Sequence, residues 1–250
     1  MIYAGLDVGS RTIKLVTLDG ILRESLVVET GVNPLRRCQE ILSGRNFQRL
    51  VVTGYGRHLV APTQGGEVVS EIKAFALGAR HLFPNCQGVI DIGGQDCKAI
   101  LLSPKGDVQR FEMNDRCAAG TGKFLEVMAQ TLEVNINALG NLALNANRKI
   151  TINSLCTVFA ESEVVSLIGR GEEASVIALA LHEAIATRVA TMAKRVGIQG
   201  KVVFAGGASL NRCLVRLMGQ RLGEELTVPE SPQMVGALGA ALLAKRDQGQ

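Results

Sequence analysis

Aromatic side chains are scarce in this sequence. They make up 4% of the 250 residues, with seven Phe, two Tyr and no Trp. Proteins that bind single-stranded nucleic acid stack the bases on aromatic side chains and gather Lys and Arg along a groove. Here 27 basic and 23 acidic residues give a net charge of only +4, and the basic residues are scattered along the chain. We therefore expect no nucleic-acid partner.

Long apolar runs are also missing. No run approaches the ~18 consecutive apolar residues that a membrane-spanning helix needs, and the first residues, MIYAGLDVGSRTIK, lack the basic and then apolar order of a signal peptide. Hydrophobic residues nonetheless make up 47% of the chain, which is enough for a substantial core. A chain of 250 residues suits one large domain or two lobes. The sequence predicts a soluble, cytoplasmic, two-lobed protein with no membrane partner.

The six cysteines form no Cys-x-x-Cys pair and show no zinc-finger spacing. Without an export signal they should be reduced. Four of them are expected to be small buried hydrophobes: Cys38, Cys86, Cys97 and Cys213. Cys117 and Cys156 differ, because each stands before apolar residues at helical spacing. A thiolate at a helix N-terminus is stabilised by the helix dipole, which is the environment that a ligand of a metal cluster uses.

Two segments of the sequence read alike, residues 7–18 (DVGSRTIKLVTL) and 91–102 (DIGGQDCKAILL). In both, an Asp is followed by a β-branched residue and a Gly, and a Lys and a Leu recur at the same later positions. Strand-like apolar runs precede and follow each Asp, so each segment is predicted to be a β-hairpin with a glycine turn. The repeat predicts two copies of one module and hence two similar lobes.

The residue types in these turns suit phosphate binding. Glycine lets backbone N–H groups approach a phosphate without obstruction by a Cβ. The carboxylates of Asp7 and Asp91 can hold Mg²⁺ through water, and the ammonium group of Lys14 or Lys98 can offset the negative charge of a phosphate. One such turn is weak evidence, but two equivalent copies predict a nucleotide phosphate site.

The rest of the chain completes this pattern. Residues 70–83 have apolar residues at helical spacing and are followed by Pro84, and residues 236–242 include small residues at positions that suit a closely packed helix. Residues 202–208 read as an apolar strand that ends in two glycines, followed by a helix from about Asn211. Such a strand–glycine–helix corner lets a base and ribose lie on the backbone.

Together these features resemble the superfamily of actin, sugar kinases and heat-shock ATPases. The resemblance implies an α/β fold with two lobes, each built on a five-stranded mixed sheet flanked by helices, and a nucleotide in the cleft between the lobes. We expect residues 1–84 and about 235–250 to form the first lobe and residues 85–234 to form the second.

Two further runs, residues 113–126 (MNDRCAAGTGKFLE) and 153–163 (NSLCTVFAESE), closely resemble the ATP-dependent activators of 2-hydroxyacyl-CoA dehydratases and the related ATPase subunits of benzoyl-CoA reductases. So do TGYGR at 53–57 and DIGGQD at 91–96. The resemblance implies that Cys117 and Cys156 bind one 4Fe–4S cluster shared by the two subunits of a homodimer. It also implies that the cluster takes an electron from ferredoxin or flavodoxin. With ATP binding and hydrolysis, the electron then passes to a partner iron–sulfur dehydratase or reductase.

The same resemblance implies the residues of the nucleotide site. The catalytic ones are Asp7, Asp91, Gln95 and Asp96, with Gln95 or Asp96 positioning the attacking water. The binding ones are Gly9, Ser10, Arg11, Thr12, Ile13, Lys14, Gly93, Gly94, Gly206, Gly207 and Gln233. Because turns commonly contain polar residues, Thr12 and Gln233 can also be explained without any contact to a nucleotide. Arg11 stands where several relatives have a small residue, so it either alters the phosphate contacts or points to solvent.

Two other functions share the fold. A small-molecule kinase would need a substrate pocket and a catalytic carboxylate base, and it leaves the two cysteine runs unexplained. A non-redox ATPase regulator that acts by changing shape would contain no iron. A brown colour after anaerobic purification would separate the iron–sulfur activator from both alternatives.

Overall fold

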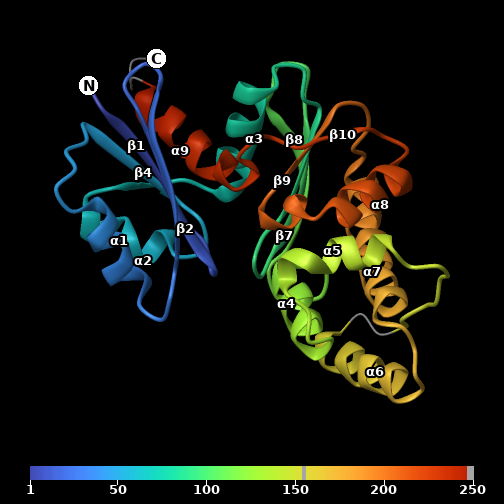
Figure 1. The fold of residues 1–250 in the computed structure, drawn as a ribbon. Helices are drawn as coiled ribbons and strands as arrows, with labels where there is room; N and C mark the ends of the chain where they lie inside the picture. The colour runs from blue at the N-terminus through green and yellow to red at the C-terminus, as the bar shows by residue number, and fades with distance from the viewer. Residues whose placement is uncertain (154–155, 247–250) are drawn as a thin grey trace. The chain divides into compact units, whose positions relative to one another are not determined.

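The computed structural model describes residues 1–153 and 156–246, so Ser154 and Leu155 of the second cysteine run lie outside the described residues. The chain divides into two compact units (Figure 1). Unit 1 comprises residues 1–86, residues 102–109 and the chain from 229 onward, and unit 2 comprises residues 87–101 and 110–228. Unlike the lobes expected from the sequence, unit 1 also takes in the short span 102–109.

Unit 1 is built on a mixed sheet in the order β3-β2-β1-β4-β5. Strand β1 (Tyr3–Val8) pairs antiparallel with β2 (Thr12–Leu18) and parallel with β4 (Arg49–Thr53). Apolar side chains of β1, β2 and β4 pack against α1 and α2 on one face, while α9 packs on the same strands and α3 packs on α9. The remaining elements are β3 (Leu22–Glu29), β5 (Glu67–Val68), α1 (Pro34–Leu42), α2 (Arg57–Val60), α3 (Glu71–Leu82) and α9 (Val235–Lys245).

Unit 2 is built on a second mixed sheet in the order β10-β9-β6-β7-β8. Strand β6 (Gly88–Ile92) pairs antiparallel with β7 (Cys97–Leu102) and parallel with β9 (Val202–Ala205). Its other strands are β8 (Val108–Asn114) and β10 (Leu226–Thr227). Its helices are α4 (Gly122–Thr131), α5 (Ile136–Leu144), α6 (Thr157–Gly169), α7 (Ala174–Val196) and α8 (Arg212–Leu222).

The two sheets share one plan. Read from the antiparallel edge, β3-β2-β1-β4-β5 corresponds to β8-β7-β6-β9-β10. In the first hairpin Asp7 lies opposite Lys14, and in the second hairpin Asp91 lies opposite Lys98. The duplicated sequence segments therefore occupy equivalent places. This confirms the predicted α/β fold with duplicated five-stranded mixed sheets flanked by helices.

Helices α3 and α9 touch backbone to backbone within unit 1. A Cβ added at Gly239 would lie 1.8 Å from the carbonyl oxygen of Ala74, and one added at Gly78 would lie 2.0 Å from that of Val235. Only glycine fits at such a distance, which explains the small residues of the last helix. Ser70 begins α3 as its N-cap, where its side chain accepts a hydrogen bond from the Lys73 amide.

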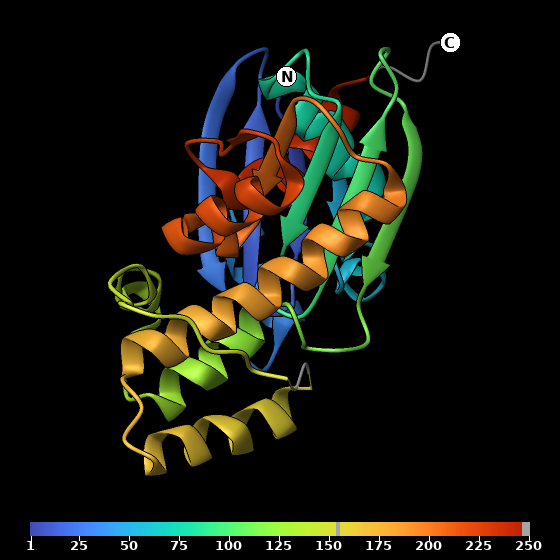
Figure 2. The ribbon, with the colours of Figure 1, turned by 90° about the vertical axis from the view of Figure 1, so that its right-hand side faces the viewer.

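Helix α7 is the central helix of unit 2. It spans 23 residues and packs against α5 and α8, and Figure 2 shows it crossing the unit diagonally. By length and composition it could cross a membrane, but 67% of its most apolar 18-residue stretch is buried inside the protein. That burial is typical of a core helix.

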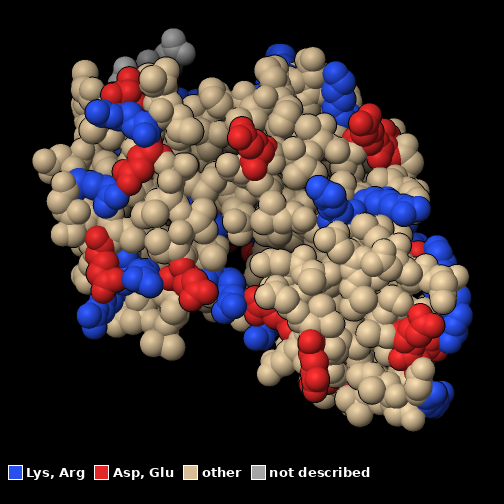
Figure 3. Space-filling view, viewed as in Figure 1, with Lys and Arg blue, Asp and Glu red and all other residues tan. Residues whose placement is uncertain are grey.

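Charged residues of both signs are mixed on the surface. On the face drawn in Figure 3, Lys and Arg alternate with Asp and Glu and form no large basic patch. This agrees with the scattered basic residues of the sequence.

Candidate functional site

The turn between β1 and β2 forms the first candidate phosphate site. The Gly9 amide donates a hydrogen bond to the Thr12 carbonyl oxygen at 3.1 Å, which closes the turn. A Cβ at Gly9 would lie 2.8 Å from that oxygen and 3.2 Å from the Lys14 Nζ, so a side chain does not fit there. Arg11 is exposed, whereas the side chain of Ile13 is buried in the core and leaves only its backbone for a ligand. A tight, glycine-lined turn of this kind leaves its backbone open to approach, as a phosphate site requires.

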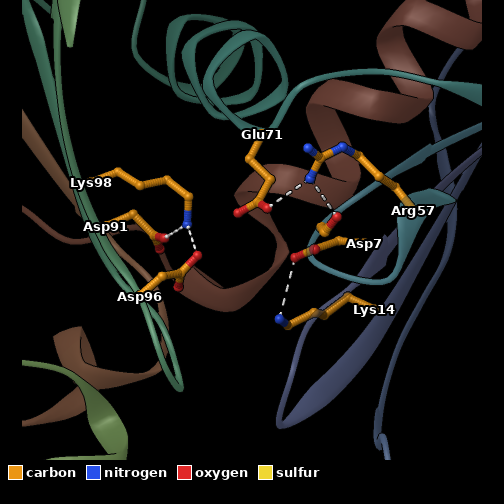
Figure 4. A network of polar contacts seen from close by, with 8 residues as sticks. Asp7, Lys14, Arg57, Glu71, Asp91, Asp96 and Lys98 are labelled. Carbon is orange, nitrogen blue, oxygen red and sulfur yellow. Dashed lines mark hydrogen bonds and ion pairs between the residues drawn. The ribbon is translucent and has the colours of Figure 1, made fainter. Parts of the chain in front are cut away.

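Asp7 lies behind this turn, at the end of β1, with its side chain 5% exposed. The Lys14 Nζ donates to Asp7 Oδ2 at 3.2 Å (Figure 4). A Cβ at Gly54 would lie 2.5 Å from Asp7 Oδ1, and one at Gly236 would lie 3.3 Å from Oδ2. Glycine at both positions therefore keeps other side chains off the carboxylate.

Arg57 and Glu71 join this half of the site and were missed by the sequence analysis. The Arg57 Nη1 donates to the Gly54 carbonyl at 2.9 Å and to Glu71 Oε1 at 3.3 Å. Figure 4 shows the Arg57 and Glu71 side chains extending toward Asp7. The signal was present in part, because Arg57 ends the TGYGR run and Glu71 follows the Ser70 cap. Only the fold brings them together.

The turn between β6 and β7 forms the equivalent site in unit 2. The Gly93 amide donates to the Asp96 carbonyl at 2.9 Å. The Lys98 Nζ lies 3.0 Å from Asp91 Oδ2 and 2.6 Å from Asp96 Oδ2, and its side chain is 2% exposed (Figure 4). Gln95 lies exposed in the turn, and within the described residues its side chain makes no hydrogen bond. Gln95 is therefore available to a ligand, while Asp96 is already bound to Lys98.

The predicted glycine corner follows β9. Gly206 has φ of +84°, and a Cβ there would lie 2.4 Å from the Ile92 carbonyl oxygen and 2.5 Å from Asp91 Oδ1. Gly206 is thus the counterpart of Gly54, since both lie against the buried Asp of their own unit. Gly207 is exposed and begins a 3₁₀ turn, Gly207–Leu210. Gln233 is half-buried in unit 1, in the 3₁₀ turn Pro232–Met234 that leads into α9.

Cys117 lies in a loop rather than at the start of a helix. We call residues 115–121 the Cys117 loop. Helix α4 begins only at Gly122, with Thr121 as its extended N-cap, because Gly120 has a left-handed φ of +86° that interrupts the helical path. The prediction of a helix directly after Cys117 is therefore wrong. The loop is held from β8 by Asn114, whose Nδ2 donates to the carbonyl of Cys117 at 2.9 Å.

Helix α4 joins the Cys117 loop to the second phosphate turn. The Gly122 amide donates to the Gly93 carbonyl at 2.9 Å, and the Lys123 amide donates to the Gly94 carbonyl at 2.7 Å. The first amides of a helix have no partner inside the helix, so the turn satisfies them. A displacement of the turn would therefore act directly on the residues that follow Cys117.

Cys156 is the N-cap of α6, as the sequence predicted for a cysteine at a helix N-terminus. It is exposed, and its carbonyl accepts a hydrogen bond from the Ala160 amide at 2.8 Å. Helix α6 packs against α4, and Thr131 near the end of α4 donates to Glu161 of α6 at 3.4 Å. The helices that follow the two cysteines are thus neighbours.

The other four cysteines are buried, as predicted. Burial raises the pKa of the Cys38 thiol to about 12 and the pKa values of Cys97 and Cys213 to about 11. Because the thiolate is the form that binds metal, these three are poor ligands. Within the described residues no group of three or more His, Cys, Asp and Glu could hold a metal ion. One chain therefore offers two accessible thiols, Cys117 and Cys156.

Known proteins match this chain over nearly its whole length. A solved structure of the activator of 2-hydroxyisocaproyl-CoA dehydratase from Clostridium difficile, with bound ADPNP, aligns with a TM-score of 0.90 at 39% identity. The match covers 98% of this chain and 94% of that one. The 2-hydroxyisocaproyl-CoA dehydratase activator of Clostridioides difficile is 40% identical over 254 residues, which cover 98% of this chain and 95% of the relative.

The (R)-2-hydroxyglutaryl-CoA dehydratase activating ATPase of Acidaminococcus fermentans is 41% identical over 250 residues, covering 96% of this chain and 95% of the relative. These matches confirm the resemblance seen in the sequence. The family described as the BadF/BadG/BcrA/BcrD ATPase family matches residues 4–244, and the chain belongs to that family.

Proposed function

We propose that this protein is an ATP-hydrolysing iron–sulfur activator. It would deliver a low-potential electron to a partner iron–sulfur enzyme, such as a 2-hydroxyacyl-CoA dehydratase or a benzoyl-CoA reductase type system. The observation that carries the proposal is the hydrogen bonding of α4 to the Gly93–Gly94 turn, just after the Cys117 loop. A turn suited to phosphate is thereby linked to a loop with an accessible thiol. Relatives named as activators of dehydratases support the activator part of the proposal.

In this proposal the glycine turns of both hairpins bind the phosphates of ATP through backbone amides. Asp7 and Asp91 hold Mg²⁺ through water, which offsets the phosphate charge. Lys14 and Lys98 keep these two carboxylates in position. We assign the orientation of the attacking water to Gln95, because Asp96 is paired with Lys98.

The adenosine part of the nucleotide would lie on the glycine corner of unit 2. Gly206 and Gly207 present backbone without a Cβ, and the following helix α8 begins at Arg212 behind its Asn211 cap. Gln233, Ser10, Arg11 and Thr12 are further candidate contacts from unit 1. Substitution of the exposed Gly207 by Val should lower ATP affinity while circular dichroism shows a folded protein, and unchanged affinity would contradict this assignment.

The proposed 4Fe–4S cluster needs a second copy of the chain. A cubane cluster takes four ligands, usually thiolates, and one chain offers Cys117 and Cys156. Two copies related by a two-fold axis would together supply four thiolates, Cys117 and Cys156 from each chain, in an isologous contact. When bound, such a cluster supplies one-electron transfer at low potential, with ferredoxin or flavodoxin as the donor. The N-terminal end of α6 next to Cys156 would favour the added negative charge.

Helix α6 also offers an apolar surface beside Cys156. The side chains of Val158, Phe159, Val165 and Ile168 are exposed although they are large and apolar. An apolar surface of this kind is typical of a contact with another protein chain. It supports a homodimer or a partner enzyme at the end of unit 2 that contains the cysteines.

ATP would act on the cysteines through unit 2 itself. A nucleotide shifts a conformational equilibrium only through its different affinity for the two conformations. The Gly93 and Gly94 carbonyls bond the first amides of α4, so a turn that closes on phosphate changes the N-terminus of α4 and the Cys117 loop. We expect an ATP analogue and ADP to give different rates of iron removal by a chelator. Identical rates would contradict the coupling.

Substitution of the cysteines tests the proposal. Cys117→Ser and Cys156→Ser should abolish iron binding and electron delivery while leaving ATP affinity within about twofold, because neither thiol belongs to the phosphate turns. Cys38→Ala is the matched control, since this thiol is buried in unit 1 and should not bind iron. Retention of full iron by either Ser variant would refute the ligand assignment. Wild-type protein that hydrolyses ATP but never binds iron would favour the non-redox regulator.

A further inference from the structure

Unit 2 contains a cavity of about 820 Å³ that the proposed function does not use. It lies between α7, the edge strand β8 and the segment 149–153, and every residue that lines it belongs to unit 2. Small-molecule sites in proteins have volumes of roughly 300–1,000 Å³. The cavity is therefore large enough for a metabolite.

The charged residues of this cavity carry an excess of positive charge. Lys149 donates to Glu183 at 2.9 Å, and Arg221 pairs with the same carboxylate. Arg195 pairs with Glu112. Arg188 also lines the cavity, and within the described residues it makes no ion pair or side-chain hydrogen bond. Four cations against two carboxylates favour an anion in this space.

In the part of the chain that the structure describes, two arginines of the cavity wall have side-chain donors without an acceptor. Arg188 is half-buried, and its stem lies against Gly120, where an added Cβ would be 3.1 Å from the Arg188 Cδ. The Nε of Arg221 is buried and has no hydrogen-bond partner in the described part of the chain. Of the two, Arg188 is the one that a ligand in the cavity can reach, because it lines the cavity and is half-exposed. The planar guanidinium of Arg188 matches a carboxylate in two parallel hydrogen bonds.

The remaining wall is apolar. Ile150 and Ile152 lie on one side, and Leu179 and Met192 lie on α7. A small inorganic anion would leave this apolar surface in contact with water, whereas the hydrocarbon part of an organic anion would cover it. The lining thus suits a molecule with an anionic end and an apolar body.

We propose that this cavity binds a small organic carboxylate, with its carboxylate on Arg188 and its apolar body along Ile152 and Leu179. The site also borders the Cys117 loop. Asn114 lines the cavity and donates to the Cys117 and Ala119 carbonyls at 2.9 and 3.3 Å. Occupancy would therefore stabilise one conformation of that loop. The consequence for electron delivery rests on the proposed function, whereas the binding itself does not.

Calorimetric titration of the full-length protein with hexanoate tests the proposal, with inorganic phosphate and hexanol as comparison probes. We expect saturable millimolar binding of hexanoate and at least about tenfold weaker binding of hexanol, whereas any phosphate binding to the proposed phosphate turns should be the same in the wild type and in Arg188→Gln. Arg188→Gln should weaken hexanoate binding at least about tenfold. Arg216→Gln, which removes an exposed arginine of α8 outside the cavity, should leave it within about twofold.

A second variant separates loss of the site from loss of folding. Ala184→Phe adds a ring to the cavity wall without changing any charge, and it should also abolish hexanoate binding while circular dichroism shows a folded protein. Phosphate that binds the wild type as tightly as hexanoate, and loses that binding in Arg188→Gln, would overturn the assignment to organic carboxylates. Equal hexanoate binding by the wild type and Arg188→Gln, or no saturable binding at all, would overturn the site. Cys117→Ser should retain hexanoate binding, so the two proposals fail separately.

Discussion

Replacement of Lys98 by Met tests how the second phosphate hairpin is stabilised. Met keeps an apolar stem in the buried space but removes the ammonium group that lies 3.0 Å from Asp91 Oδ2 and 2.6 Å from Asp96 Oδ2. The Asp91 side chain is only 3% exposed, so solvent compensates for loss of the lysine only in small part. Removing one partner of a buried ion pair costs about 3–5 kcal/mol. We expect Lys98→Met to lower the free energy of unfolding by about this amount.

The duplication provides a matched control in Lys14→Met. Lys14 occupies the equivalent position in the first hairpin, where it pairs with Asp7 alone at 3.2 Å and its side chain is 14% exposed. One longer contact with some access to water should contribute less, about 1–2 kcal/mol. The structure therefore predicts unequal effects from two substitutions that look identical in the sequence.

Urea unfolding followed by circular dichroism measures both effects at one fixed protein concentration. The midpoint for Lys98→Met should fall by at least about twice as much as that for Lys14→Met, because free energy is proportional to the midpoint at constant slope. A Lys98→Met midpoint equal to that of the wild type would refute the reasoning. So would a larger effect of Lys14→Met.

Three further predictions concern single residues. Asp91→Ala should lower Mg²⁺-dependent ATP hydrolysis at least about tenfold, a loss of ~1.4 kcal/mol; unchanged hydrolysis by the folded variant would remove Asp91 from the site. Gln95→Ala should lower kcat about tenfold or more while ATP affinity stays within about twofold, and equal losses in both would show a binding role instead. Burial lowers the pKa of His182, so the unfolded chain takes up its proton first as pH falls. Stability should therefore decrease below about pH 6.5, and His182→Gln should flatten the urea midpoint across that range.

Local patterns were enough to predict the parts of the fold that the chain repeats. Each hairpin is a short-range structure, in which a glycine turn and alternating apolar residues determine the pairing of Asp7 with Lys14 and of Asp91 with Lys98. The Gly206 corner and the glycine contacts of α9 were likewise visible, because only glycine permits such close approaches.

Other features depend on information that periodicity does not contain. The helix after Cys117 begins four residues late, at Gly122, because the left-handed conformation of Gly120 has no signature in an apolar pattern. Arg57 and Glu71 meet beside Asp7 only after the sheet and α3 have packed. The apolar residues of α6 correctly predicted a helix, but they lie on several faces, so their exposure could not be read from spacing.

Native mass spectrometry of anaerobically prepared protein, combined with iron analysis, tests the central claim most directly. The proposal that Cys117 and Cys156 of two chains share one cluster predicts a species of two chains with four irons and four sulfides. Removal of iron by a chelator should shift it toward the single chain. A stable single chain that binds four irons would contradict the account, since buried thiols such as Cys97 would then have to be ligands.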